Sequence, residues 1–309
     1  MKLFKPIFVI MSLFIIVTST ALAEKPRKVV NKSFDVKADG QLIIDTDLGS
    51  IKITTHSQNT VDAEVIFKSK TNSERKFESA LEDFELTFNQ NGNEITIEGN
   101  KDHDNWLKTN PFNLEFIVVV PKEFNVNLNT SGGSISVDDL NGNVDAHTSG
   151  GSLHFGEIDG VVNGKTSGGS IQVESCNGDI DVKTSGGSIK LGSIEGDVVA
   201  HTSGGSITVE EVKGNIDAKT SGGGVNAKLL NTPTARCSLK TSGGSIEVRL
   251  GKDVKCSVDA STSGGGVYTD FPIMVQGKWG NHSLRGDING GGPSLICKTS
   301  GGGIRILEY

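Results

Sequence analysis

The four-residue word Thr-Ser-Gly-Gly constrains the fold of this chain more than any other feature. It occurs nine times, and its copies begin at Thr130, Thr148, Thr166, Thr184, Thr202, Thr220, Thr241, Thr262 and Thr299. Successive copies are 18 residues apart five times, then 21 residues twice and 37 residues once. A fixed period in this range is typical of stacked repeats, so we expect one coil for each copy. The last interval is close to two periods, which predicts one coil that has lost its tag and gained a loop.

Within each repeat the apolar residues also keep fixed places. They recur five, seven and ten places after the threonine, a glycine follows at twelve, and two small or apolar residues precede the next threonine. In the first repeat these residues are Ile135, Val137, Leu140, Gly142, Val144 and Ala146. Period-two alternation that is broken by glycine indicates strand, turn and strand, and not helix.

An 18-residue unit of two or three short strands cannot bury its apolar side alone. Stacked on similar neighbours it can, so the sequence predicts an all-β fold, a parallel β-solenoid with about 18 residues per coil. Ten or so coils would form a rod of roughly 50 Å at about 4.8 Å per coil. The tag threonine has the inward parity of the residues before it, so we expect its hydroxyl to bond backbone at a corner.

Charged side chains occupy two outward positions of the repeat. The position three before the threonine reads Asp145, Asn163, Asp181, Val199 and Asp217. The position one before it reads His147, Lys165, Lys183, His201 and Lys219. Alternating aspartate with neutral residues avoids like charges on adjacent strands. The pattern fits a solvated face tuned for stacking, and its alternative is a stripe that binds glycans or anions.

Residues 24–129 are less regular, with only four of the 40 glycines of the chain. Asp45 to Ile53 resembles a degenerate repeat, and residues 84–88, 94–98 and 114–120 indicate further strands. The spacing of Phe77, Leu81 and Phe84 predicts one short amphipathic helix after Asn72 or Ser73. We therefore divide the chain into a β-rich N-terminal cap at 24–129, continuous with the solenoid, and the repeat solenoid at 130–309.

The first 23 residues have the features of a signal peptide. Lys2 and Lys5 precede an apolar run over 7–17, and Ala21-Leu22-Ala23 forms a small-x-small cleavage site. An uncleaved anchor is the alternative, but the run is short for a bilayer span of about 20 residues. No later stretch is apolar enough to cross a membrane. We expect an exported protein that is periplasmic, on the outer surface or secreted.

Charge and motifs narrow the classes of partner. Loss of the two leader lysines takes the formal charge from −7 to −9, which argues against nucleic acid. The sequence has no phosphate-cradling loop, nucleophile elbow or metal-site spacing, so we expect no cofactor and no enzyme. The densest acidic group is Asp138, Asp139, Glu157, Asp159 and Glu174, which varies between coils as solvated loops do. One threonine per coil with inward parity also argues against ice binding.

The four cysteines, Cys176, Cys237, Cys256 and Cys297, fall at inward, apolar places of the repeat. A free cysteine at such a place is an ordinary small core residue. An exported chain also permits disulfides, and a bridge between Cys237 and Cys256 on neighbouring coils is the alternative.

The chain resembles a bacterial β-strand-repeat domain of unknown function that is labelled "putative adhesin" and is similar in style to autotransporter adhesin heads. The resemblance covers residues 30–309. It rests on Gly49 to Ile53, Val118 to Pro121, the tandem Thr-Ser-Gly-Gly-Ser-Ile units, Arg285 to Gly292 and the final unit from Thr299 to Ile304. The resemblance implies an adhesin without lending any catalytic or binding residue, and the label itself is an analogy from fold.

We therefore expect a non-enzymatic exported protein of the cell envelope, an adhesin or a module that binds surfaces or glycans. Its partners would be envelope or extracellular glycans or protein surfaces. The alternatives are a self-assembling structural scaffold and a carbohydrate-active enzyme on a β-helix. The expected binding surface lies where the repeat breaks, at Phe271, Met274, Trp279 and His282. The other interpretation of this segment is that Phe271 and Trp279 fold down and seal the C-terminal coils.

Overall fold

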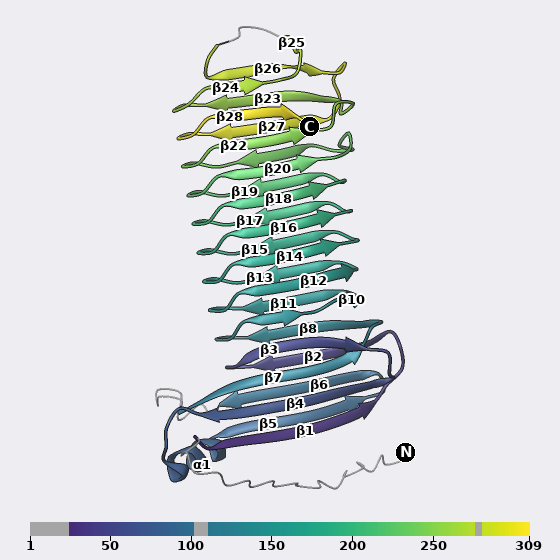
Figure 1. Cartoon of the computed structure of the whole chain (residues 1–309), viewed down its shortest axis with the longest axis vertical. Coiled ribbons are helices and arrows are strands. Elements are labelled where there is room, and N and C mark those ends of the chain that lie inside the picture. Colours follow the sequence, from purple (N-terminus) through teal and green to yellow (C-terminus); the bar gives the residue numbers. More distant parts are fainter. Residues whose placement is uncertain (1–24, 102–110, 276–279) are drawn as a thin grey trace, which may run out of the picture.

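The computed structural model describes residues 25–101, 111–275 and 280–309. Two long β-sheets face each other, and the coils that supply their strands are stacked along the axis of a rod (Figure 1). Within these residues each sheet has 14 strands, and one helix, α1 (Glu74–Glu82), lies at the N-terminal end. The predicted parallel β-solenoid with one short helix is confirmed.

The strands of each sheet follow one another along the axis of the rod. The first sheet, sheet A, has in this order β1 (Arg27–Asp35), β4 (Thr60–Ser69), β7 (Phe112–Pro121), β3 (Ser50–His56), β9 (Ile135–Val137), β12 (Leu153–Asp159), β14 (Ile171–Cys176), β16 (Ile189–Ile194), β18 (Ile207–Val212), β20 (Val225–Leu229), β22 (Ile246–Leu250), β28 (Ile304–Glu308) and β24 (Val267–Thr269), with β10 (Leu140–Asn141) beside β12. The second, sheet B, has β5 (Phe84–Asn91), β6 (Glu94–Lys101), β2 (Gly40–Thr46), β8 (Phe124–Thr130), β11 (Val144–Thr148), β13 (Val162–Lys165), β15 (Ile180–Lys183), β17 (Val198–His201), β19 (Ile216–Lys219), β21 (Cys237–Lys240), β27 (Ser294–Thr299), β23 (Cys256–Thr262), β26 (Ser283–Ile288) and β25 (Met274–Val275).

In the middle of the rod each coil contributes one strand to each sheet. The strands pair in parallel with residues one repeat apart, for example Leu153 with Ile171 and Val144 with Val162. The apolar places of the repeat point between the sheets, where the side chains are almost completely buried. The spacing read from the sequence therefore sets both the register and the core.

The tag threonines form a ladder of buried hydroxyls at one corner of the solenoid. Each donates a hydrogen bond to the carbonyl oxygen of the second tag glycine on the preceding coil, at 2.6–2.9 Å. The expected inward threonine is confirmed. The glycines are required because the coils nearly touch here: a β-carbon on Gly151 would collide with the carbonyl oxygen of Gly133.

Two further ladders join the polar corners. Where a serine follows the glycine pair, its hydroxyl accepts the backbone N–H of the equivalent residue on the next coil, as Ser152 does from Ser170. Asn143 accepts in the same way from Val161, and Asp197 from Asn215. Such bonds satisfy backbone donors that a turn would otherwise leave unpaired.

The C-terminal end departs from the expected order of coils. The last coil, formed by β27 and β28, lies between the coil of β21 and β22 and the coil of β23 and β24. The threonine ladder follows the same order, because Thr299 bonds Gly244 while Thr262 bonds Gly302. The sequence predicted a coil without a tag in the 37-residue interval, and this prediction is wrong. The interval instead contains the antiparallel strands β25 and β26. β26 pairs antiparallel with β23, and β25 pairs antiparallel with β26, so these two strands end sheet B (Figure 1).

The N-terminal end is also out of sequence order. The coil of β2 and β3 lies between the coil of β6 and β7 and the coil of β8 and β9. Its degenerate tag works like the others, since Thr46 donates to Gly99 and Thr130 donates to Gly49. The strands expected at 84–88, 94–98 and 114–120 are confirmed as β5, β6 and β7.

The antiparallel strands β1, β4 and β5 close this end of the rod. The helix begins after Ser73 as expected, and it buries Phe77 against a cluster of edge-on rings formed by Phe67, Phe84 and Phe112. Phe84 lies at the start of β5 and not in the helix, because the helix ends at Glu82.

Candidate functional site

The segment where the repeat breaks contains the four residues expected to form a binding surface. Phe271 is buried, with 5% of its surface exposed, and belongs to the core. Met274 is 74% exposed, and His282 is exposed on the last corner. Trp279 lies outside the described residues. The structure therefore separates Phe271 from Met274 and His282, and only the latter two face solvent.

Residues 281 and 282 close the last coil. The carbonyl oxygens of Asn281 and His282 accept the N–H groups of Val267 and Thr262, both at 2.9 Å. The imidazole Nδ1 of His282 lies 2.6 Å from the carbonyl oxygen of Gly265. In the middle of the rod a further coil supplies the equivalent acceptors, as Lys183 does for Thr166. This geometry is that of a lid over the terminal corner.

The densest acidic group is spread over corner and face positions. Asp139 accepts the N–H of Glu157, Asp159 accepts from the amide of Asn177, and Glu174 lies 3.7 Å from His154. Each of these three carboxylates already has a partner within the stack. Among the described residues no group of three or more histidine, cysteine or acidic side chains could hold a metal ion.

All four cysteines are buried and free. Burial raises the pKa of each thiol, to about 11 for Cys176 and about 12 for Cys256. The alternative of a bridge between Cys237 and Cys256 is wrong, because β27 lies between β21 and β23. The sequence order had made these strands neighbours. Protonated, enclosed thiols are poor nucleophiles, so these side chains act as core residues.

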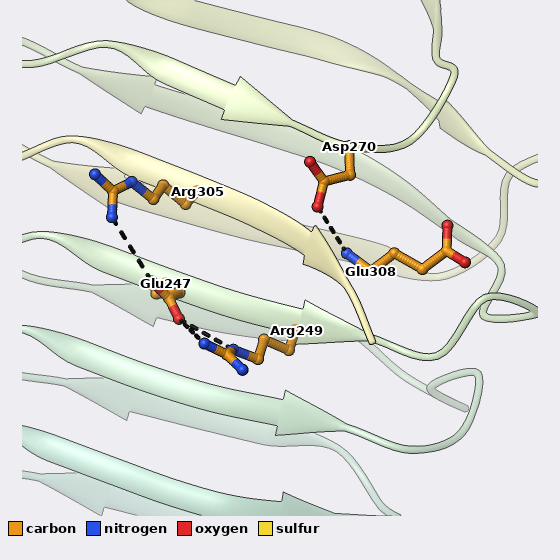
Figure 2. Close-up of polar contacts among 5 residues, drawn as sticks. All are labelled: Glu247, Arg249, Asp270, Arg305 and Glu308. Carbon is orange, nitrogen blue, oxygen red and sulfur yellow. Dashed lines mark hydrogen bonds and ion pairs between the residues drawn. The ribbon is translucent and has the colours of Figure 1, made fainter.

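Charges on the outer face of sheet A neutralise one another between coils. Lys190 pairs with Glu210 at 2.9 Å, and Lys228 pairs with Glu211 at 2.8 Å. Near the C-terminal end, Glu247 accepts from Arg249 at 2.9 Å and lies 4.0 Å from Arg305 (Figure 2). Just above, a carboxylate oxygen of Asp270 accepts the N–H of Glu308 (Figure 2). The charged side chains named here thus form ion pairs with one another on the outer face of sheet A.

The outer face of sheet B is different. The position one before each tag threonine carries a lysine or histidine on seven consecutive strands, from β11 to β27. We call this set the basic column: His147, Lys165, Lys183, His201, Lys219, Lys240 and Lys298. Each member is the direct strand partner of the next.

Two members of this column were missed by the sequence analysis, which ended it at Lys219. Lys240 was recognisable, because it precedes the tag at Thr241. Lys298 also precedes a tag, but only the insertion of β27 beside β21 places it next to Lys240. In sequence order the next residue would have been Ser261.

The aspartates expected to alternate beside the column do so. Asp145, Asp181 and Asp217 lie on every second strand, separated by Asn163 and Val199. Four side-chain polar atoms in the described part of the chain are shielded from solvent without a hydrogen bond, and all four lie on this face: Asp145 Oδ1, Asp181 Oδ1, His201 Nε2 and Ser238 Oγ. Three of these side chains still have a charged neighbour on the face: Asp145 Oδ1 lies 3.4 Å from His147 Nε2, Asp181 pairs with Lys183 at 2.9 Å, and His201 Nε2 lies 3.6 Å from Asp217.

A family model matches residues 40–306, which is most of the chain and includes both out-of-order coils. The chain belongs to the Toastrack DUF4097 family. The Toastrack family has no known catalytic role. No curated protein matches the sequence. Among the described residues of this Toastrack chain, no helix is long and apolar enough to cross a membrane.

This chain matches solved structures over nearly their whole length, at low sequence identity and with TM-scores below 0.5. A "putative adhesin" from Bacteroides fragilis is 11% identical with a TM-score of 0.41, and the match covers 91% of this chain and 97% of that one. One from Parabacteroides distasonis is 13% identical with a TM-score of 0.43 and the same coverages. A "putative lipid binding protein" from P. distasonis is 12% identical with a TM-score of 0.34, covering 91% and 96%. At these values the names of the neighbours do not transfer to this member of the Toastrack family.

Proposed function

We propose that this chain is a non-catalytic binding protein of the cell envelope, of the adhesin type, that is exported by its first 23 residues. One observation carries the proposal. The outer face of sheet B is a long, regular surface on which seven successive strands each carry a lysine or histidine, and among the described residues three of these lysines have no carboxylate within 4.0 Å. A rigid rod can present such a face to a glycan or to a protein surface.

Other parts of the molecule support this assignment over its alternatives. Three of the five acidic residues considered for a carbohydrate-active enzyme, Asp139, Asp159 and Glu174, serve as hydrogen-bond or ion-pair partners within the stack. End-to-end assembly into a scaffold would need open ends, whereas antiparallel strands cover both sheets at the N-terminal end and sheet B at the C-terminal end, which leaves only the three-residue strand β24 at the end of sheet A. A side face is therefore the better candidate for contact with a partner.

The test is a binding screen of residues 24–309 against purified cell-wall fractions, envelope glycans and intact cells. We expect retention on at least one of these surfaces and no turnover of any glycan in the panel. Absence of binding throughout the screen would reject the proposal. Release of shortened sugars would instead assign an enzyme, and concentration-dependent filaments without a ligand would assign a scaffold.

A further inference from the structure

The basic column is a single file of five lysines and two histidines, with one member per coil. Its seven members span roughly 29 Å at about 4.8 Å between strands. The inserted C-terminal coil lengthens it, because Lys298 stands between Lys240 and the neutral Ser261. The column thus runs without interruption from β11 to β27.

Three members of the column have no acidic partner. In the described residues, no carboxylate lies within 4.0 Å of the amino groups of Lys165, Lys219 or Lys240. The other members lie within that distance of an aspartate on the same or the next strand. Over the same seven strands the face has only three aspartates, Asp145, Asp181 and Asp217. The face is therefore positive, although the whole chain carries −7.

This arrangement does not help the fold. Like charges on directly paired residues destabilise a sheet, and two unit charges about 4 Å apart in water repel by about 1 kcal/mol. The neighbouring aspartate position avoids the same problem by alternation, and sheet A avoids it by pairing opposite charges. The column instead places lysine directly beside lysine at three places, Lys165 with Lys183, Lys219 with Lys240 and Lys240 with Lys298, and these charges call for a partner that neutralises them.

From this charge complementarity we propose that the basic column binds an extended, carboxylate-bearing polysaccharide laid along the rod axis. The inference rests on the proposed function and names the substrate class of the same face. A polymer with about one carboxylate per sugar presents its charges at a spacing comparable with that of successive strands. Exposed Lys165 and Lys219 and half-buried Lys240 supply ammonium donors to the carboxylates. The aspartates between them accept hydrogen bonds from sugar hydroxyls.

A nucleic acid fits this surface less well. Duplex DNA carries about one charge per 1.7 Å of axis, far denser than a column whose five lysines lie about 4.8 Å or more apart. Strands β11 to β27 place no phenylalanine, tyrosine or tryptophan on the outer face of sheet B, so bases would lack a stacking platform. The negative charge of the rest of the chain would also repel a dense polyanion.

The experiment compares two triple variants of residues 24–309. The first, Lys165→Gln/Lys219→Gln/Lys240→Gln, removes the three unpaired cations and breaks no ion pair. The matched control, Lys52→Gln/Lys252→Gln/Lys255→Gln, makes the same change of charge at exposed sites outside the strands that carry the basic column. Binding to polygalacturonate, to neutral dextran and to single-stranded DNA is measured by biolayer interferometry at several salt concentrations. Melting temperatures of all variants are measured alongside.

We expect polygalacturonate to bind the parent chain and the control with affinities within about twofold, and the column variant at least tenfold more weakly, with a flatter salt dependence. Dextran should not bind. Equal losses in both triple variants, or a parent chain that ignores polygalacturonate, would overturn the inference. Tighter binding of DNA than of polygalacturonate would also overturn it. If the column variant keeps full retention on cell-wall fractions, the proposed function stands and the basic column is not its site.

Discussion

The middle of the rod and its two ends are built from the same coil but follow different rules. From β11 to β22 the order of coils along the axis is the order along the chain. At each end one coil is out of order, and antiparallel strands lie beyond it. The coil of β2 and β3 is stacked beneath a coil that comes about 80 residues later, as the bond from Thr130 to Gly49 records.

This difference separates two kinds of information in the sequence. The tag specifies how any two coils stack, because the same threonine-to-glycine bond joins coils 18 residues apart and coils far apart in the chain. It does not specify which coils are neighbours. The order of coils changes at the ends, where irregular segments cover most of the last coil and leave only the short strand β24 as a parallel edge of sheet A.

The strongest test of the stacking rule is a pair of glycine substitutions in the middle of the rod. Gly151→Ala should destabilise the chain by about 3 kcal/mol, because the new methyl collides with backbone of the coil below. Gly150→Ala, the neighbouring glycine of the same tag, should cost at most about 1 kcal/mol, since its nearest new contact is 3.8 Å away. Chemical denaturation of both variants measures the difference. Equal losses would show that the close approach of coils does not govern stacking.

The ends should respond differently from the middle. Leu284 in β26 is buried, and Leu284→Asp places a charge beneath the terminal strand pair. We expect strands β25 and β26 to detach from β23, which exposes the edge of β23 and lets the chain self-associate. The unfolding of the middle coils should change little. Light scattering after size-exclusion chromatography detects the association. The control, Ser283→Asp, alters an exposed neighbour on the same strand and should stay monomeric.

The threonine ladder has the same hydrogen bond in the middle of the rod and at its C-terminal end. Thr184→Val leaves the carbonyl of Gly169 without its donor and should cost about 1–2 kcal/mol. Thr262→Val removes an equivalent bond to Gly302 on the last full coil. Its effect on global unfolding should be smaller, because terminal coils open before the rest of a stack. Hydrogen exchange of the two variants would contradict this if Thr262→Val lowered protection equally along the whole rod.

The repeat made most of the fold predictable, since Ile171 and Ile189 pair one period apart and their inward parity could be read directly. The exchange of coils at the C-terminal end was not predictable, because Thr241, Thr262 and Thr299 carry interchangeable tags. The role of the 271–283 segment was ambiguous for a similar reason: Asn281 and His282 close the corner through backbone carbonyls, which leave no side-chain signature. The basic column was visible as far as Lys219, but its continuation into Lys298 depended on the exchange.

The cysteines allow the two regions to be compared by pH. Burial raises the thiol pKa above its ordinary value of 9.0 in the folded chain, so between about pH 9 and about pH 11 the unfolded chain loses protons that the folded chain keeps. Stability from this source is complete below pH 9 and falls as the pH rises. Three of the four thiols lie on β21, β27 and β23, so the C-terminal coils should loosen first.

The measurement is the melting temperature and limited proteolysis at about pH 8 and about pH 10.5. We expect C-terminal cleavage sites to appear first at the higher pH. The variant Cys237→Ala/Cys256→Ala/Cys297→Ala is less stable at both values, but its melting temperature should depend less on pH. If the dependence is unchanged in this variant, ionisation of lysines or tyrosines is responsible instead.

The smallest effect should come from the paired charges of sheet A. Glu247→Gln removes the acceptor of Arg249 and the neighbour of Arg305, yet both arginines are more than half exposed. Solvent screens such pairs, so we expect a loss of at most about 0.5 kcal/mol in the free energy of unfolding. The same variant should leave polygalacturonate binding unchanged, because Glu247 lies on the outer face of sheet A, whereas the basic column lies on sheet B. If this substitution altered glycan binding as strongly as loss of the unpaired lysines, the contrast between the two faces would fail. A change of charge anywhere on the surface of the rod would then be enough to alter binding.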